Sequence, residues 1–269
     1  MRYSLLKRSN VMSSKWLRCR FQKADSSVNL ICFPWAGGGT SYYTGSWGRK
    51  LQNTGIEVHA VCLPGRENRY KEPFYQDWQA LVSDFCKDSH KELGRKQFAF
   101  WGHSFGALFC YEVAVKLKYQ YGIEACHLLV SGASAPQIPR PSRGYNDLSD
   151  EDLAERLRSW GGTPSAILEN KEIMDLSVKM LRADLTLLEK YRYSGESTES
   201  ILSCPITSFD GDKDLHEKKG FSELTTGEFS SHVLPGGHFY FFNNERPLLD
   251  LIESHLLPIF SKSATATSR

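Results

Sequence analysis

The sequence predicts an α/β fold in which a mostly parallel sheet is covered by helices on both faces. Short apolar runs bounded by turn residues recur along the chain, and helix-length amphipathic segments lie between them. Strands that alternate with helices favour a parallel sheet, because each helix returns the chain to begin the next strand in the same direction. The predicted strands are VNLICFPW from residue 28, VHAVCLP from 58, FAFWG from 98, HLLVSG from 127, CPITSFDG from 204 and SHVLPGG from 231.

Three helices are predicted from the segments that flank these strands. Residues 74–93, FYQDWQALVSDFCKDSHKEL, form a helix-length segment, and a second helix follows Ala107, where apolar residues recur at helical spacing. In residues 244–260, NERPLLDLIESHLLPIF, Asn244 precedes a charged first turn and Pro247 lies near the start. Both features are typical of a helix N-terminus, so the chain is expected to end in a helix that covers the sheet.

Residues 140–199 interrupt this alternation, since they contain helical patterns but no strand signal. Ser149 before Asp-Glu-Asp is a helix start, and KEIMDLSVKMLRADLTLLEKYRY is a longer helical segment. An all-helical insertion between two strands predicts a lid over the active-site edge, with additional packing helices as the alternative. The predicted organisation is an N-terminal extension at 1–14, a core at 15–139 and 200–262, the lid at 140–199 and a C-terminal tail at 263–269.

Composition argues against several classes of protein. The net charge of +2 gives no reason to expect a nucleic-acid partner. No apolar run approaches the roughly 20 residues that span a bilayer, so no membrane association is expected. The seven cysteines are scattered and lack any C-x-x-C pair, which predicts a reducing, cytoplasmic environment and no metal site. The first fourteen residues have basic residues but no acidic ones, and we expect a disordered extension there rather than a targeting segment.

A candidate nucleophile lies between the predicted strand at residue 98 and the helix that follows it. The turn reads Gly102-His103-Ser104-Phe105-Gly106. A sharp strand-to-helix turn needs small residues on both sides, and it exposes the serine hydroxyl at its apex. This is the G-x-S-x-G nucleophile elbow of α/β-hydrolases, in the structural context that the motif requires.

A serine nucleophile needs a histidine base and an acid to orient that base, in the chain order Ser, Asp or Glu, His. His238 follows the last predicted strand in the glycine-flanked turn LPGGHFYFF and is the predicted base. Asp210, Asp212 and Asp214 follow the preceding strand; Asp214, at the fourth position of a G-x-x-D turn, is favoured over Asp212, and Asp210 is least favoured. The remaining histidines are expected to be packed or solvated: His59, His90, His103, His127, His216, His232 and His255.

Two backbone N–H groups are expected to stabilise the oxyanion. One belongs to Phe105, the residue after the nucleophile, and the other to Ala36 in the glycine-rich loop FPWAGGG. The same loop type can hold phosphate, but AGGGTSYY lacks both the Walker lysine and the G-x-G-x-x-G spacing.

The sequence resembles the type II thioesterase family from Trp16 to about Phe260. The resemblance rests on LICFPWAGGGTS, LPGRENR, EPF, GHSFGA, SGASAP, LRADL and LPGGHFY in the family's order and spacing. The ICFPWAGGGTS and GHSFGA blocks are similar to those of the medium-chain S-acyl fatty acid synthase thioesterases (oleoyl-ACP hydrolases) of animals. The family also includes the external thioesterases of polyketide and nonribosomal-peptide synthases.

The resemblance implies that Ser104, Asp214 and His238 form the triad, with Ala36 and Phe105 as oxyanion donors. It implies hydrolysis of acyl chains from the phosphopantetheine arm of an acyl carrier protein, which would be a transient partner of a monomeric enzyme that needs no cofactor or metal. The helical insertion should then supply an acyl tunnel. The expected lining residues are Ile167, Leu168, Met174, Met180, Leu181 and Leu185. A basic rim for an acidic carrier is expected from Arg66, Arg69, Arg140 and Arg143.

Three alternatives remain open at this level. An oxygen-ester carboxylesterase or lipase uses the same triad, and an acyltransferase uses the same G-H-S-x-G serine. A catalytically inactive binding module is the third, although all three triad positions are filled.

Overall fold

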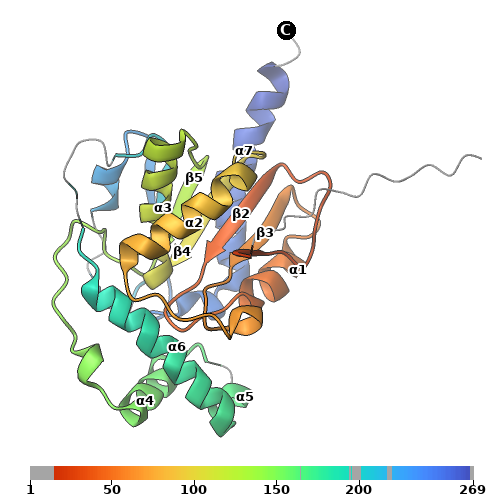
Figure 1. Cartoon of the computed structure of the whole chain (residues 1–269). Helices are drawn as coiled ribbons and strands as arrows, with labels where there is room; N and C mark the ends of the chain where they lie inside the picture. Colours follow the sequence, from red (N-terminus) through yellow and green to blue (C-terminus); the bar gives the residue numbers. More distant parts are fainter. Residues whose placement is uncertain (1–14, 164, 194, 196–200, 217–219, 267–269) are drawn as a thin grey trace, which may run out of the picture.

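The computed structural model describes residues 15–163, 165–193, 195, 201–216 and 220–266. Seven strands form one sheet in the order β1-β3-β2-β4-β5-β6-β7. Figure 1 labels the central strands β3, β2, β4 and β5. All neighbouring strands are parallel except β1, which runs antiparallel to β3. The strands are β1 (Leu17–Arg18), β2 (Val28–Phe33), β3 (Ile56–Val61), β4 (Phe98–His103), β5 (His127–Ser131), β6 (Ile206–Gly211) and β7 (Phe229–Leu234). The predicted α/β fold is confirmed, and β1 is the strand that was not predicted.

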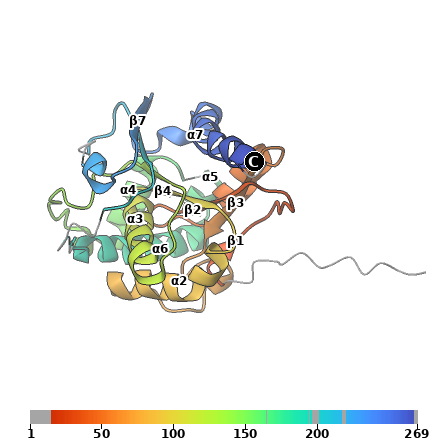
Figure 2. The same cartoon turned by 90° about the horizontal axis from the view of Figure 1, so that it is seen from above.

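Helices cover both faces of this sheet. Helices α2 and α3 lie on one face, and α7 lies on the other (Figures 1 and 2). The helices are α1 (Gly48–Lys50), α2 (Trp78–Leu93), α3 (Phe105–Tyr121), α4 (Asp150–Trp160), α5 (Ser165–Leu168), α6 (Lys171–Lys190) and α7 (Glu245–Ala266). The other helical turns are η1 (Tyr43–Trp47), η2 (Glu67–Arg69), η3 (Tyr145–Asp147), η5 (Phe221–Leu224) and η6 (Tyr240–Phe242). Helix α7 includes residues 263–266, which were expected in a C-terminal tail; the predicted extension at 1–14 lies outside the described residues.

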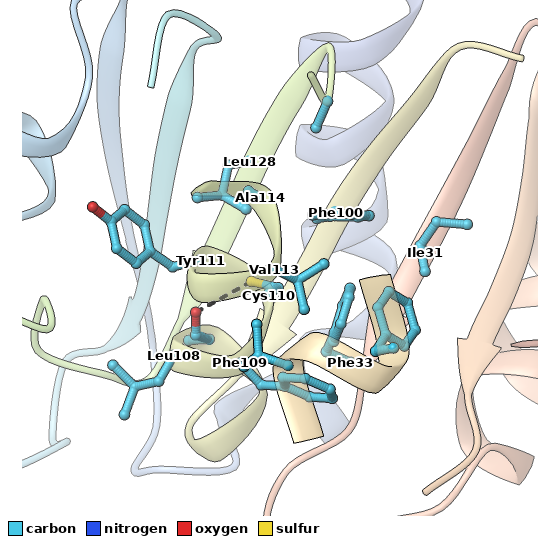
Figure 3. Packing of buried hydrophobic residues seen from close by; sticks show 14 of the residues in the cluster. Ile31, Phe33, Phe100, Leu108, Phe109, Cys110, Tyr111, Val113, Ala114 and Leu128 are labelled. Atoms are coloured by element: carbon cyan, nitrogen blue, oxygen red, sulfur yellow. Dashed lines mark hydrogen bonds between the residues drawn. The ribbon is translucent and has the colours of Figure 1, made fainter. Parts of the chain in front are cut away.

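The sheet separates two hydrophobic clusters. On the side of α2 and α3, Phe33 packs edge-on against Phe100 and Phe109, with ring centroids 5.0 and 5.1 Å apart (Figure 3). On the side of α7, Trp101 packs against Trp47 at 5.0 Å, in the cluster that also contains residues of α7. Strands β2, β3, β4 and β5 are buried along their whole length. Strands β2, β4 and β5 therefore appear in the sequence as mostly apolar runs, whereas β3 also contains the buried polar residues Glu57 and His59.

Helices α4, α5 and α6 lie together beyond the carboxyl end of the central strands (Figure 1). Ser149 caps α4 with a capping box, accepting a hydrogen bond from the Asp152 N–H, as its position before three acidic residues predicts. The two longer helices share a third buried cluster, which includes Leu153 of α4 and Val178, Leu181 and Leu185 of α6. Thus these helices have a small core of their own next to the edge of the sheet where strands β2, β4 and β6 end.

Candidate active site

Ser104 lies at the junction of β4 and α3 in a backbone conformation that is unfavourable for any residue with a side chain. Its φ is 56° and its ψ is −115°. One hydrogen bond from the Ser104 N–H to the Ser131 carbonyl (2.8 Å) and another from the Ala107 N–H to the Ser104 carbonyl (3.0 Å) hold it there. Strain of this kind persists only where the surrounding structure enforces it, and it is concentrated at functional sites. The serine is half-buried at the N-terminus of α3.

The glycines of the motif allow this turn because backbone segments approach them closely. A Cβ at Gly102 would lie 2.2 Å from the Gly106 carbonyl oxygen, and a Cβ at Gly106 would lie 2.2 Å from the Phe33 carbonyl oxygen. Neither contact is with a flexible side chain that could move aside. Glycine is therefore required at both positions for β4, α3 and the end of β2 to pack together.

Asp214 and His238 form a hydrogen-bonded pair at the same edge of the sheet. His238 Nδ1 lies 2.7 Å from Asp214 Oδ2, and the side chain of His238 is 33% exposed. Asp212, the alternative acid, instead accepts a hydrogen bond from the Gly236 N–H at 2.7 Å. That bond helps to hold the turn that carries His238. The geometry thus pairs the histidine with Asp214 and gives Asp212 a role in the backbone of the loop.

His216 also belongs to this cluster. The sequence predicts it to be a packed or solvated histidine. Its Nε2 lies 2.8 Å from Asp210 Oδ1 and its Nδ1 lies 3.1 Å from Asp214 Oδ2, with the side chain only 10% exposed. Burial lowers the pKa of His216, but the two carboxylates outweigh burial and raise it to about 9. The ring is therefore cationic at neutral pH. A polar sequence around it gave no sign of this pairing.

The same contacts keep Asp214 ionised. Burial alone raises the pKa of the Asp214 carboxyl, yet the contacts with His216 and His238 more than offset this and hold the pKa well below its usual range. An ionised aspartate can both orient a neighbouring histidine and stabilise its protonated form.

His103 lies behind the pair, with its ring centroid 4.8 Å from that of His238. Its Nδ1 is 2.9 Å from Ser131 Oγ, which in turn lies 2.8 Å from the Tyr240 hydroxyl. Complete burial, together with the neighbouring His238, lowers the pKa of His103 well below its ordinary value. His103 is therefore a neutral, packed residue, as the sequence analysis expected.

Two backbone N–H groups are the candidate oxyanion donors. Phe105 is the first residue of α3, so its N–H has no partner within the helix. In the part of the chain that the structure describes, no hydrogen bond uses the N–H of Ala36 either, whereas the N–H of the next residue, Gly37, donates to Asp184 Oδ2 at 2.7 Å. No hydrogen bond among the described residues joins Ser104 to His238. Catalytic hydrogen bonds of this kind are often long in the absence of substrate and shorten when it binds.

The expected basic rim is wrong for two of its four arginines. Arg66 and Arg69 are each 3% exposed. Arg66 pairs with Asp184, and Arg69 pairs with Glu72 and donates to the Cys62 carbonyl. Both side chains are used inside the protein, since a buried guanidinium needs several acceptors. Arg140 and Arg143 are exposed, as a rim requires.

The residues expected to line an acyl tunnel differ in their surroundings. Leu181 and Leu185 are buried in the cluster shared by α4 and α6, and Met174 is also buried. Ile167, Leu168 and Met180 are half-buried. Their role in holding an acyl chain stays a prediction.

Within the part of the chain that the structure describes, two groups of three side chains bring possible metal-ligand atoms within 4.8 Å of one another. One contains Cys19, Glu57 and His59, and the other contains Asp214, His216 and His238. In both groups the carboxylate is already paired with a histidine, so we assign neither group to a metal. Among the described residues, no helix has the length and apolar character needed to cross a membrane.

The elbow at Ser104 and the order of the sheet place this chain among the α/β-hydrolases. The chain matches the family model described as "Thioesterase domain" over residues 28–256. It therefore belongs to the thioesterase family, and this membership supports thioester hydrolysis as its class of activity.

Individual relatives and solved structures show which kinds of thioesterase this chain is similar to. The chain is 39% identical to "S-acyl fatty acid synthase thioesterase, medium chain" of Rattus norvegicus, over 85% of this chain and 87% of that protein. It is 32% identical to "Thioesterase PikA5" of Streptomyces venezuelae, over 92% and 88% of the two chains. It also superimposes on the type II thioesterase BorB from the borrelidin biosynthetic cluster, with a TM-score of 0.79, 31% identity and coverage of 90% and 97%. The resemblance to type II thioesterases is confirmed.

Proposed function

We propose that this protein hydrolyses acyl thioesters carried on the phosphopantetheine arm of an acyl carrier protein, and releases the free acid. The proposal rests mainly on the hydrogen bond between Asp214 and His238, at the sheet edge where the strained turn exposes Ser104. Relatives named as fatty acid synthase and polyketide-type thioesterases support this class of substrate. The carrier protein is a transient partner, and the reaction needs no metal or cofactor.

In the first half of the proposed reaction, Ser104 Oγ attacks the thioester carbonyl carbon while His238 takes the hydroxyl proton. Asp214 stabilises the imidazolium that forms, and its strongly ionised state suits this task. The N–H groups of Ala36 and Phe105 donate to the oxyanion. The C–S bond then breaks, and His238 returns its proton to the departing sulfur. A thiol with a pKa near ~8.5 leaves readily, so this step requires little assistance.

In the second half, water attacks the acyl–Ser104 ester. His238 removes a proton from that water and then donates it to Ser104 Oγ, which leaves as the acid is released. The same groups act in both halves, because the two tetrahedral intermediates place their charge in the same oxyanion site.

The test is hydrolysis of acyl carrier protein thioesters from C2 to C18, set against a panel of matched oxygen esters. We expect free acid from the thioesters, no turnover with Ser104→Ala, and a chain-length optimum that reports how the acyl chain is held. Cleavage of oxygen esters alone would replace the proposal with a carboxylesterase or lipase. Absence of both activities, together with failure of a serine-reactive fluorophosphonate to label Ser104, would leave a binding module. Transfer of the acyl group to an added thiol or alcohol in preference to water would identify an acyltransferase.

The proposed location is the cytoplasm. All seven cysteines are free in the structure, and five are buried, where the thiols act as small apolar side chains. Such a pattern suits a reducing compartment.

A further inference from the structure

The oxyanion loop, residues 34–40, is held by side chains from two different parts of the molecule. Arg66 and Glu67 reach it from the segment after β3, which belongs to the core. Asp184 reaches it from the middle of α6, which belongs to the helical layer beyond the sheet edge. Through Asp184, helix α6 therefore links the helical layer to the core.

Asp184 uses both of its oxygens at this junction. Oδ2 accepts from the Gly37 N–H at 2.7 Å and from Arg66 Nη1 at 2.9 Å, and Oδ1 accepts from Arg66 Nη2 at 2.7 Å. The side chain of Asp184 is only 4% exposed, and that of Arg66 is 2% exposed. Gly37 follows Ala36 directly, so this bond fixes the peptide next to the proposed oxyanion donor.

The core side of the junction fixes the rest of the loop. Arg66 Nη1 also donates to the Gly38 carbonyl at 2.7 Å. Glu67 accepts from the Thr40 N–H and from the Thr40 hydroxyl, both at 2.7 Å. Glu67 has a φ of 50°, an uncommon value for a residue other than glycine. These contacts hold residues 38–40, whereas Gly37 is held by Asp184, the only side chain among the described residues that bonds to its N–H.

Helix α6 also packs directly against the loop. A Cβ at Gly37 would lie 3.3 Å from Leu181 Cβ and 3.4 Å from Leu181 Cα, and the φ of Gly37 is 77°. The side chain of Ala36 packs against the buried cluster of α4 and α6. The helix therefore defines one wall of the space in which the loop lies.

We propose that Asp184 is a positioning residue that makes the oxyanion loop competent only while α6 is in place, so that the helical layer controls the chemical step as well as access. This inference rests on the proposed function, because it assigns the loop an oxyanion role. A displaced α6 would take the carboxylate away from Arg66 and leave a buried guanidinium unpaired, which is strongly unfavourable. The loop and the helix therefore change position together.

The experiment compares two variants at this junction with a control residue of α4 that pairs with α6 elsewhere. Asp184→Asn removes the charge. The double variant R66M/D184L replaces both members of the buried ion pair with apolar residues, a change that proteins often accept without loss of stability. Asp150→Asn is the control, because Asp150 pairs with Arg182 of α6 (2.6 Å) and none of the hydrogen bonds among the described residues joins it to the oxyanion loop. Circular dichroism and thermal unfolding establish that each variant is folded at the assay temperature.

We expect kcat to fall about 10- to 100-fold in R66M/D184L and in Asp184→Asn, with KM changed less than about threefold, since a misplaced oxyanion donor acts in the transition state. The rate of serine labelling by a fluorophosphonate should fall by a similar factor. Asp150→Asn should retain both rates. A higher KM with unchanged kcat would reduce the pair to a role in substrate binding, and an equal loss in Asp150→Asn would assign the effect to α6 in general. Either result overturns the proposal.

A measurement on the wild-type protein does not depend on how the variants fold. In hydrogen–deuterium exchange, residues 34–40 should become protected together with the middle of α6 when the fluorophosphonate adduct forms. Protection of the loop without α6 would contradict the coupling. If the wild type cleaves oxygen esters and not thioesters, the proposed function fails, yet the same kcat comparison on the ester still tests Asp184.

Discussion

His216 and His238 contact the same oxygen of Asp214: His216 Nδ1 lies 3.1 Å and His238 Nδ1 lies 2.7 Å from Oδ2. The aspartate thus lies between two imidazole rings, and the second ring is also paired with Asp210. A protonated His216 stabilises the folded protein because it interacts with the carboxylates of both Asp210 and Asp214.

This relationship predicts how stability depends on pH. The pKa of His216 is raised to about 9 in the folded protein, above its ordinary value near 6.5. Its contribution is therefore complete below about pH 6.5 and is lost as the pH rises through 9. His216→Gln should remove this decline, with a difference between pH 6.5 and 9 on the order of 1–2 kcal/mol after allowance for partial solvent screening.

Urea denaturation at several pH values checks this prediction. Lys213→Gln is the control, because it removes an exposed charged side chain from the same loop. If the wild type and His216→Gln decline in parallel between pH 6.5 and 9, His216 is not held as a cation.

The two candidate acids should differ sharply in mutants. Asp214→Asn should lower kcat by about 10⁴, because an amide next to the His238 ring favours the wrong tautomer. Asp212→Asn should cost less than about tenfold, since its amide oxygen can still accept from the Gly236 N–H. Steady-state kinetics of both variants on one substrate measures the difference. The reverse order would assign the acid to Asp212.

Replacing Ser104, the proposed nucleophile, should reveal the strain of the turn. Ser104→Gly and Ser104→Ala both lose the hydroxyl, but only glycine adopts φ 56° and ψ −115° without steric conflict. Ser104→Gly should therefore be more stable than Ser104→Ala by about 1 kcal/mol or more. Urea denaturation of the two inactive variants makes the comparison, and equal stabilities would mean that the turn relaxes when the serine is removed.

Close backbone contact at the elbow predicts a severe folding defect for Gly102→Ala. The added methyl group would lie 2.2 Å from the Gly106 carbonyl oxygen. Gly45→Ala is the matched control, because a Cβ there has no described atom within 4 Å. We expect Gly102→Ala to express as insoluble or unfolded protein and Gly45→Ala to fold with activity close to the wild type. Soluble, active Gly102→Ala would show that β4 and α3 can separate.

Much of the fold and of the candidate site could be predicted from sequence because the signals are local. Most of the central strands are short apolar runs. The five consecutive residues of the G-x-S-x-G motif are sufficient to predict the strand-to-helix turn and the exposed serine. The two-residue strand β1 could not be predicted, since a periodic pattern needs more residues than it has.

The missed features depend on contacts between distant segments. Arg66 and Asp184 are 118 positions apart, and only the folded chain shows that they bury each other's charge. His216 follows its strand within a charged stretch, so its pairing with Asp210 becomes apparent only once the loop folds back. The sequence does not distinguish an exposed arginine from a buried one, and the expected rim was wrong for Arg66 and Arg69 for that reason.

The order of the sheet has a consequence for refolding. Ala36, Ser104, Asp214 and His238 follow β2, β4, β6 and β7, which are neighbours in the sheet or separated by a single strand, yet they span about two hundred positions of the chain. No fragment that lacks one of these strands contains the full set. Catalytic activity should therefore return only with the last long-range strand pairing, after much of the helical signal has recovered. Turnover thus reports completion of the whole native topology, and circular dichroism reports its earlier stages.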